Sequence, residues 1–138
     1  FVLYGEEDLT NRSALSREEV AAWVREGLVE WMGAVSDMPK VYAACHLVVL
    51  PSYREGLPKT LIEAGACGRA SVTTDVPGCR EIVKDGVNGL LVPPRDSEAL
   101  AKAIRRLKQD AGLRQSMARR AREIVEAEYD VRQVVAAQ

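Results

Sequence analysis

Short, continuously apolar segments alternate with helical patterns along the whole chain, and this alternation restricts the fold most strongly. The clearest apolar segment is His46 to Leu50. Further strands are predicted over residues 1–4, 28–33, 70–74 and 90–92. Strands without a polar face are covered on both sides of their sheet. The sequence therefore predicts an α/β fold built on a doubly wound parallel sheet.

Helix-start signals separate the predicted strands. Ser16 and Glu19 form a capping box, and Gly27 ends the helix that follows. Asp96 and Asp110 open two helices with apolar stripes. Shorter helices are expected over residues 39–45, 58–67 and 80–84, with a last one from residue 131. Ligands bind such sheets at the carboxyl ends of the strands, so a site is expected in the loops that follow strands.

Charge and hydropathy argue against two broad classes of protein. Lys and Arg number 19 against 20 Asp and Glu, so the charge gives no support for sequence-independent binding to nucleic acid. No apolar run in the sequence approaches the roughly 20 residues that a membrane-spanning helix needs.

The 3 cysteines form no Cys-x-x-Cys pair, which favours reduced thiols and a cytoplasmic location. The length favours a single domain over residues 1–138.

The segment from Val49 to Ala64 contains the residues that most clearly predict a binding site. A strand ends at Leu50, a loop rich in Gly and Pro follows, and a helix then begins at Pro58. Pro suits the first helical turn because it has no N–H group there to leave unpaired. The free N–H groups of the next residues would face the crevice, and such a helix start binds anions readily. Gly56 allows a ligand to approach the backbone closely.

Two carboxylates flank this helix start, Glu55 before it and Glu63 within it. A carboxylate repels a phosphate but accepts hydrogen bonds from sugar hydroxyls. The pattern therefore suits a ligand with phosphate in the middle and hydroxyl-rich groups at both ends, such as a nucleotide diphosphate sugar. The alternative is purely structural, because Glu63 could be a solvated helix residue and Glu55 could favour the helix dipole.

The same segment resembles the signature of retaining glycosyltransferases of the GT-B fold, in particular their large family 4. The family pattern is matched by Pro51-Ser52, by Glu55-Gly56 and by Glu63-Ala64-Gly65-Ala66-Cys67-Gly68. Further motifs at similar spacing are Gly33-x-Val35, residues 72–78, residues 81–93 and the helix from residue 96 to 107. The resemblance covers nearly the whole chain, and it implies a Rossmann-like sheet that forms the carboxyl-terminal half of a GT-B enzyme.

The resemblance also implies roles for individual residues. Glu55 would bind hydroxyls of the donor sugar and is the candidate catalytic residue, whereas Glu63 would bind the ribose. The sugar and the diphosphate would be held along the helix start, and the base would lie near Val35. The donor-binding residues expected on this ground are Val35, Glu55, Gly56, Leu57, Pro58, Lys59, Thr60 and Glu63. Members of the family need no metal or other cofactor, and their donor is a UDP-sugar or, less often, a GDP-sugar.

The family pattern implies more chain than these 138 residues. A first strand and helix with an Arg and a Lys for the diphosphate would precede Phe1, as would an acceptor-binding domain. We therefore expect the chain to be a donor-domain fragment that is inactive alone. Its sheet could close directly between residues 1–5 and 46–50, or another chain could fill the gap. The full-length enzyme would build bacterial surface polysaccharide or glycoconjugate, at the inner face of the membrane or in contact with it.

Two other functions remain open at the level of sequence. A nucleotide-sugar epimerase of similar fold would need a catalytic His with carboxylates, and His46, the only histidine, is expected to be structural. A nucleotide- or phosphate-binding module without turnover is the other alternative. Arg80 is expected to form a surface salt bridge, although it could meet a donor phosphate. The run from Arg119 to Glu123 is expected to be a solvated helix face, with attraction to anionic lipid as the alternative.

Overall fold

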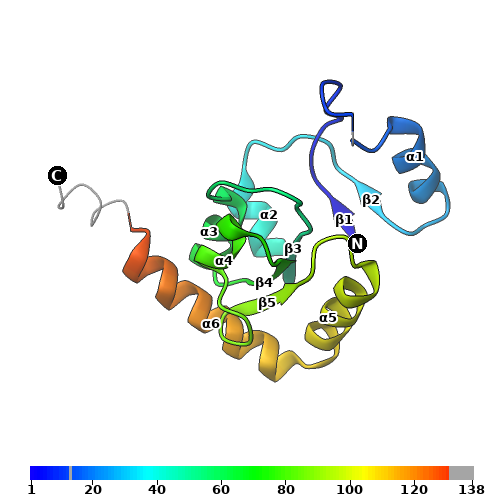
Figure 1. Ribbon diagram of the computed structural model, residues 1–138. Coiled ribbons are helices and arrows are strands. Elements are labelled where there is room, and N and C mark those ends of the chain that lie inside the picture. Colours follow the sequence, from blue (N-terminus) through cyan, green and yellow to red (C-terminus); the bar gives the residue numbers. More distant parts are fainter. Residues whose placement is uncertain (13, 131–138) are drawn as a thin grey trace. The chain divides into compact units, whose positions relative to one another are not determined.

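The computed structural model describes residues 1–12 and 14–130 and confirms an α/β fold with parallel strands (Figure 1). The chain divides into two compact units, Phe1–Met38 and Pro39–Gln138. The expectation of a single domain over residues 1–138 stays a prediction. Within the described ranges, no helix combines the length and the apolar character that crossing a bilayer requires.

The first unit holds two short strands and one helix. Strand β1 (Val2–Leu3) pairs in parallel with β2 (Glu30–Trp31), and α1 (Arg17–Arg25) lies between them in sequence. The predicted capping box at the start of α1 is confirmed, since the Ser16 hydroxyl accepts from the Glu19 amide and the Glu19 carboxylate accepts from the Ser16 amide. Both strands are shorter than predicted, and no described residue of this unit is buried.

The second unit holds a three-stranded parallel sheet in the order β3-β4-β5. In the register of these strands, Val49 faces Val72 and Val72 faces Leu90. The elements of this unit run in chain order as α2 (Met38–Ala44), β3 (Leu47–Leu50), α3 (Lys59–Ala66), β4 (Ala70–Thr74), α4 (Pro77–Ile82), β5 (Gly89–Val92), α5 (Ser97–Gln109) and α6 (Ala111–Glu128). Helix α2 begins one residue before the boundary between the units.

Two hydrophobic clusters cover the sheet of the second unit. On one face, Val72 and Leu90 pack with Leu107 of α5 and Met117 of α6. The other cluster joins Leu61 of α3 with Cys79 and Ile82 of α4 and with Val76 and Val83, which flank α4. All five residues of β4 are buried, as expected for a central strand covered on both sides. This packing fixes the directions in which the loops after β3 and β4 leave the sheet.

Most predicted elements are confirmed, although several of their bounds differ. Helix α4 begins at Pro77 rather than Arg80, because Pro77 occupies the first helical turn instead of a free-standing turn. Strand β1 pairs with β2 within the first unit, and how the sheet closes between residues 1–5 and 46–50 stays open. The helix predicted from residue 131 lies outside the described residues.

Candidate functional site

The start of α3 presents backbone N–H groups that no side chain caps. Pro58 is the N-cap residue, and its side chain cannot accept a hydrogen bond from the first helical turn. Lys59 is exposed at the first helical position, and Thr60 is partly exposed beside it. The helix follows β3, so this turn lies at the carboxyl end of that strand. Uncapped N–H groups and the positive end of the helix dipole together favour an anion at this place.

Glu55 lies in the loop that precedes this helix. The Ser52 hydroxyl donates a hydrogen bond of 2.5 Å to its Oε1 atom, and the residue is half-buried. Within the described part of the chain, its other oxygen accepts no hydrogen bond. The carboxylate is therefore held by one oxygen and leaves the other available to a hydroxyl donor.

Two threonines of β4 hold the beginning of the same loop. The Thr73 hydroxyl donates to the carbonyl oxygen of Leu50 at 2.7 Å, and the Thr74 hydroxyl donates to the carbonyl oxygen of Ser52. Thr73 and Thr74 are buried, so these hydroxyls satisfy the backbone where it leaves the sheet. The loop that carries Glu55 is thus fixed to the central strand by side chains.

Glu63 is exposed on α3, one turn beyond the helix start. The hydroxyl of Tyr42, on α2, donates a hydrogen bond of 2.9 Å to its Oε2 atom. Tyr42 is only 3% exposed, and burial is the main cause that raises the pKa of its hydroxyl, followed by the hydrogen bond to Glu63 and the charge of Glu63. The tyrosine therefore stays a hydrogen-bond donor to Glu63 at neutral pH.

Arg69 holds Tyr42 in turn. Its Nε atom donates to the carbonyl oxygen of Tyr42 at 2.6 Å, and its Nη2 atom donates to that of Ala43 at 2.9 Å. Sequence reasoning did not identify the hydrogen bond between Tyr42 and Glu63. It also missed the threonines, for which the signal was two hydroxyl side chains at the end of an otherwise buried strand.

The predicted site residues fall into two groups by position. Seven of them lie together in the loop after β3 and in α3, namely Glu55, Gly56, Leu57, Pro58, Lys59, Thr60 and Glu63. Val35 belongs to the first unit, so its place beside a base stays a prediction. In residues 1–12 and 14–130, no group of three or more His, Cys, Asp or Glu side chains could hold a metal ion.

Two other residues singled out in the sequence lie outside this group. Arg80 forms the expected surface salt bridge, with 2.5 Å between its Nε atom and Oδ1 of Asp75. His46 directly precedes β3, at the opposite end of that strand from Glu55. It is exposed rather than packed into the core, and the expectation that it is structural stays a prediction. Within the described residues, no hydrogen bond or ion pair joins this histidine to Glu55 or Glu63.

Residues 1–110 match the family described as glycosyl transferases group 1. An N-acetylgalactosaminyltransferase from Campylobacter jejuni, whose substrate is N,N'-diacetylbacillosaminyl-diphospho-undecaprenol, is 37% identical over 88% of this chain. A D-inositol 3-phosphate glycosyltransferase from Salinispora tropica is 42% identical over 60% of this chain. The chain spans 31% of the first relative and 17% of the second, so it corresponds to a minor part of each.

Solved structures give the same result for the fold. The Anabaena protein HepE, crystallised with UDP, superposes on 99% of this chain with a TM-score of 0.86 and 29% identity, and 39% of HepE is covered. The carboxyl-terminal domain of a group 1 glycosyl transferase from Francisella tularensis superposes with a TM-score of 0.74 and 28% identity. The superposition includes 83% of this chain and 62% of that domain. The chain belongs to the group 1 glycosyl transferases and has the fold of the carboxyl-terminal half of GT-B enzymes.

Proposed function

We propose that this chain is the donor-binding part of a retaining glycosyltransferase and that it binds a nucleotide diphosphate sugar at the start of α3. The observation that carries the proposal is the uncapped first turn of α3 with one oriented carboxylate on each side. The N–H groups suit the diphosphate, and the carboxylates suit the hydroxyl-rich groups at its two ends.

Each residue has a role in this proposal. Glu63 accepts hydrogen bonds from the ribose, and the free oxygen of Glu55 accepts from the donor sugar, where the bond is broken. The backbone of Gly56, Leu57, Pro58, Lys59 and Thr60 surrounds the diphosphate, and Val35 lies near the base. As the sugar leaves, negative charge develops on the diphosphate, and the fixed N–H groups of α3 stabilise it without any metal.

The relatives support a UDP-sugar as donor, with a GDP-sugar as the second choice. Structures of HepE contain UDP and UDP-glucose, and these ligands are proposed for the present chain by similarity. The relative from Campylobacter acts on a diphospho-undecaprenol substrate, which supports synthesis of a bacterial glycoconjugate at the cytoplasmic face of a membrane. The acceptor would be bound by a further domain, because the relatives are much longer than this chain.

Titration of the chain with UDP tests the ribose role. We expect Glu63→Ala to weaken UDP binding about tenfold, because it removes a charged acceptor of hydrogen bonds to the ribose. Calorimetry provides the measurement, and Glu98→Ala, an exposed substitution in the first turn of α5, provides the control. Equal UDP affinity of the Glu63 variant and the control would reject the ribose role.

Comparing UDP with UDP-glucose tests the role of Glu55. We expect Glu55→Ala to weaken UDP-glucose binding several-fold and to leave UDP binding unchanged, because only the sugar contacts this carboxylate. Calorimetry with both ligands and the same Glu98→Ala control separates the two effects. A uniform loss for both ligands would show instead that the loop, and not a sugar contact, depends on Glu55.

The two alternatives predict different results. An epimerase would invert a stereocentre of the sugar, and the position of His46 at the opposite end of β3 from Glu55 disfavours this. A binding module without turnover would bind UDP but transfer nothing. We expect this second result for the 138 residues alone, since they correspond to 31% of the Campylobacter enzyme. Robust transfer by this chain would contradict that expectation and leave the binding assignments in place.

A further inference from the structure

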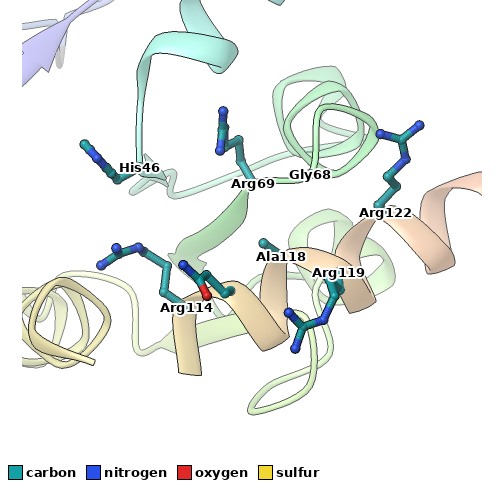
Figure 2. A pocket seen from close by; sticks show the side chains of 8 residues that line it. His46, Gly68, Arg69, Arg114, Ala118, Arg119 and Arg122 are labelled. Atoms are coloured by element: carbon teal, nitrogen blue, oxygen red, sulfur yellow. The ribbon is translucent and has the colours of Figure 1, made fainter. Parts of the chain in front are cut away.

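A hollow of about 340 Å³ lies at the end of the sheet where β3 and β4 begin. His46 and Arg69, which line it, directly precede these two strands, whereas the loop with Glu55 follows the other end of β3. Helix α6 forms the opposite wall with Arg114, Ala118, Arg119 and Arg122 (Figure 2). Every lining residue belongs to the unit Pro39–Gln138.

Four arginines line this hollow, and no Asp or Glu does. Two of them are held by backbone carbonyl groups. Arg69 donates to the carbonyl oxygens of Tyr42 and Ala43, and Nη1 of Arg114 donates to those of Leu107 and Lys108 at 2.8 and 3.2 Å. Carbonyl groups carry no net charge, and within the described residues neither Arg69 nor Arg114 forms an ion pair with a carboxylate. A guanidinium has five N–H groups, and several on each side chain remain available.

The two arginines nearer the end of α6 are exposed. Arg119 has no ion pair within the described part of the chain, whereas Nε of Arg122 donates to Oε1 of Glu126 at 2.7 Å. Figure 2 shows the guanidinium groups of Arg69, Arg119 and Arg122 pointing in different directions around Ala118. The positive charge is therefore spread around the rim and not focused on one point.

We propose that this hollow binds a ligand that carries two or more phosphate groups. Guanidinium groups match phosphate oxygens in pairs, which gives shorter and stronger hydrogen bonds than neutral donors do. A rim of separated cations suits several linked or neighbouring phosphates better than a single one. The phosphate groups come either from a soluble oligophosphate or from the headgroups of an anionic lipid surface, since both present the same chemistry.

The test uses the 138-residue chain labelled with ¹⁵N and titrated with sodium pyrophosphate. We expect the amide signals of residues 68–69 and 114–122 to shift, and the effect to weaken with added salt because the rim is exposed. In a second arm, the chain is sedimented with vesicles of phosphatidylglycerol or of phosphatidylcholine. Binding to pyrophosphate assigns a soluble ligand, and binding to phosphatidylglycerol vesicles alone assigns a lipid headgroup.

Two double variants test whether the phosphate probe binds at the hollow. The double variant Arg119→Gln/Arg122→Gln should bind the responding probe about tenfold more weakly. The control Arg105→Gln/Arg120→Gln removes the same charge from exposed positions on α5 and α6 that do not line the hollow, and it should bind as the parent chain does. Equal effects of the two variants, no response to either probe, or shifts confined to residues 59–61 would each overturn the proposal. The last result would mean that pyrophosphate binds only at the start of α3.

Discussion

At the scale of single residues, the direction of the Glu63 carboxylate is the feature with most consequence. An exposed glutamate on a helix normally samples several rotamers, and ordering it on ligand binding costs entropy. Here the buried hydroxyl of Tyr42 holds its Oε2 atom, and Arg69 holds the backbone of Tyr42. The carboxylate is thus oriented before any ligand arrives. Pre-organisation of this kind improves affinity because less freedom is lost on binding.

Removing the hydroxyl oxygen of Tyr42 should therefore weaken UDP binding. The Tyr42→Phe variant should bind UDP about fivefold more weakly, because the loss of one hydrogen bond of about 1 kcal/mol frees the Glu63 side chain. Calorimetric titration with UDP gives the measurement. Far-ultraviolet circular dichroism should show an unchanged fold, since the phenyl ring fills the same space.

The control for this prediction is Tyr129→Phe, which also removes a hydroxyl from the second unit. That hydroxyl donates only a long hydrogen bond of 3.4 Å to the carbonyl oxygen of Glu81. Its loss should leave UDP binding unchanged. The orienting role of Tyr42 is wrong if Tyr42→Phe binds UDP like the control while Glu63→Ala binds it weakly.

At the scale of elements, the close approach of α4 to the loop after β3 shapes the site. A side chain at position 78 would collide with the carbonyl oxygens of Glu55 and Gly56. Only glycine fits there, because it has no side chain. Gly78 lies in the first turn of α4, at the carboxyl end of β4. Helix α4 therefore supports the backbone beside Glu55 directly. Any side chain at this position must push the loop or the helix away.

We predict that Gly78→Ala lowers both stability and donor affinity. Overpacking against backbone atoms costs about 1–3 kcal/mol of unfolding free energy, and the shifted loop misplaces Glu55. Urea denaturation measures the first effect, and titration with UDP-glucose measures the second. The control is Gly112→Ala in α6, where an added methyl group meets only ordinary contacts and should leave the stability equal or slightly higher. Unchanged urea midpoints for Gly78→Ala would contradict the argument.

The sequence was sufficient to predict most elements, including the loop and helix that carry the candidate site, because they depend on local patterns. The strand over residues 70–74 has the predicted bounds, and Asp96 and Asp110 cap α5 and α6 as expected. The contacts that hold the site were not predictable, because they join residues distant in the chain. The partner of the Thr73 hydroxyl lies 23 residues away, and that of the Tyr42 hydroxyl lies 21 residues away. No local pattern identifies such partners.

At the scale of the whole molecule, the two units differ in how much they bury. Every buried side chain among the described residues belongs to Pro39–Gln138, where two clusters cover the sheet. In the first unit, β1 and β2 are two residues long each. Exposed large side chains are frequent in that unit and include Phe1, Val2, Leu9, Leu28 and Met32. Because apolar burial is the dominant stabilising term, the two units should differ widely in local stability.

Hydrogen exchange followed by mass spectrometry tests this difference. Amides of β4 should exchange at least about a thousandfold more slowly than the intrinsic rate, because they open only when the second unit unfolds, at a cost of about 4 kcal/mol or more. Amides of β1 and β2 should exchange close to the intrinsic rate, since a two-stranded ribbon without buried side chains opens readily. The exchange rate of each strand is compared with that of a helix in the same unit, α1 in the first unit and α5 in the second. Equal protection of β1 and β4 would show that the first unit has a stabilising contact that its own residues do not provide.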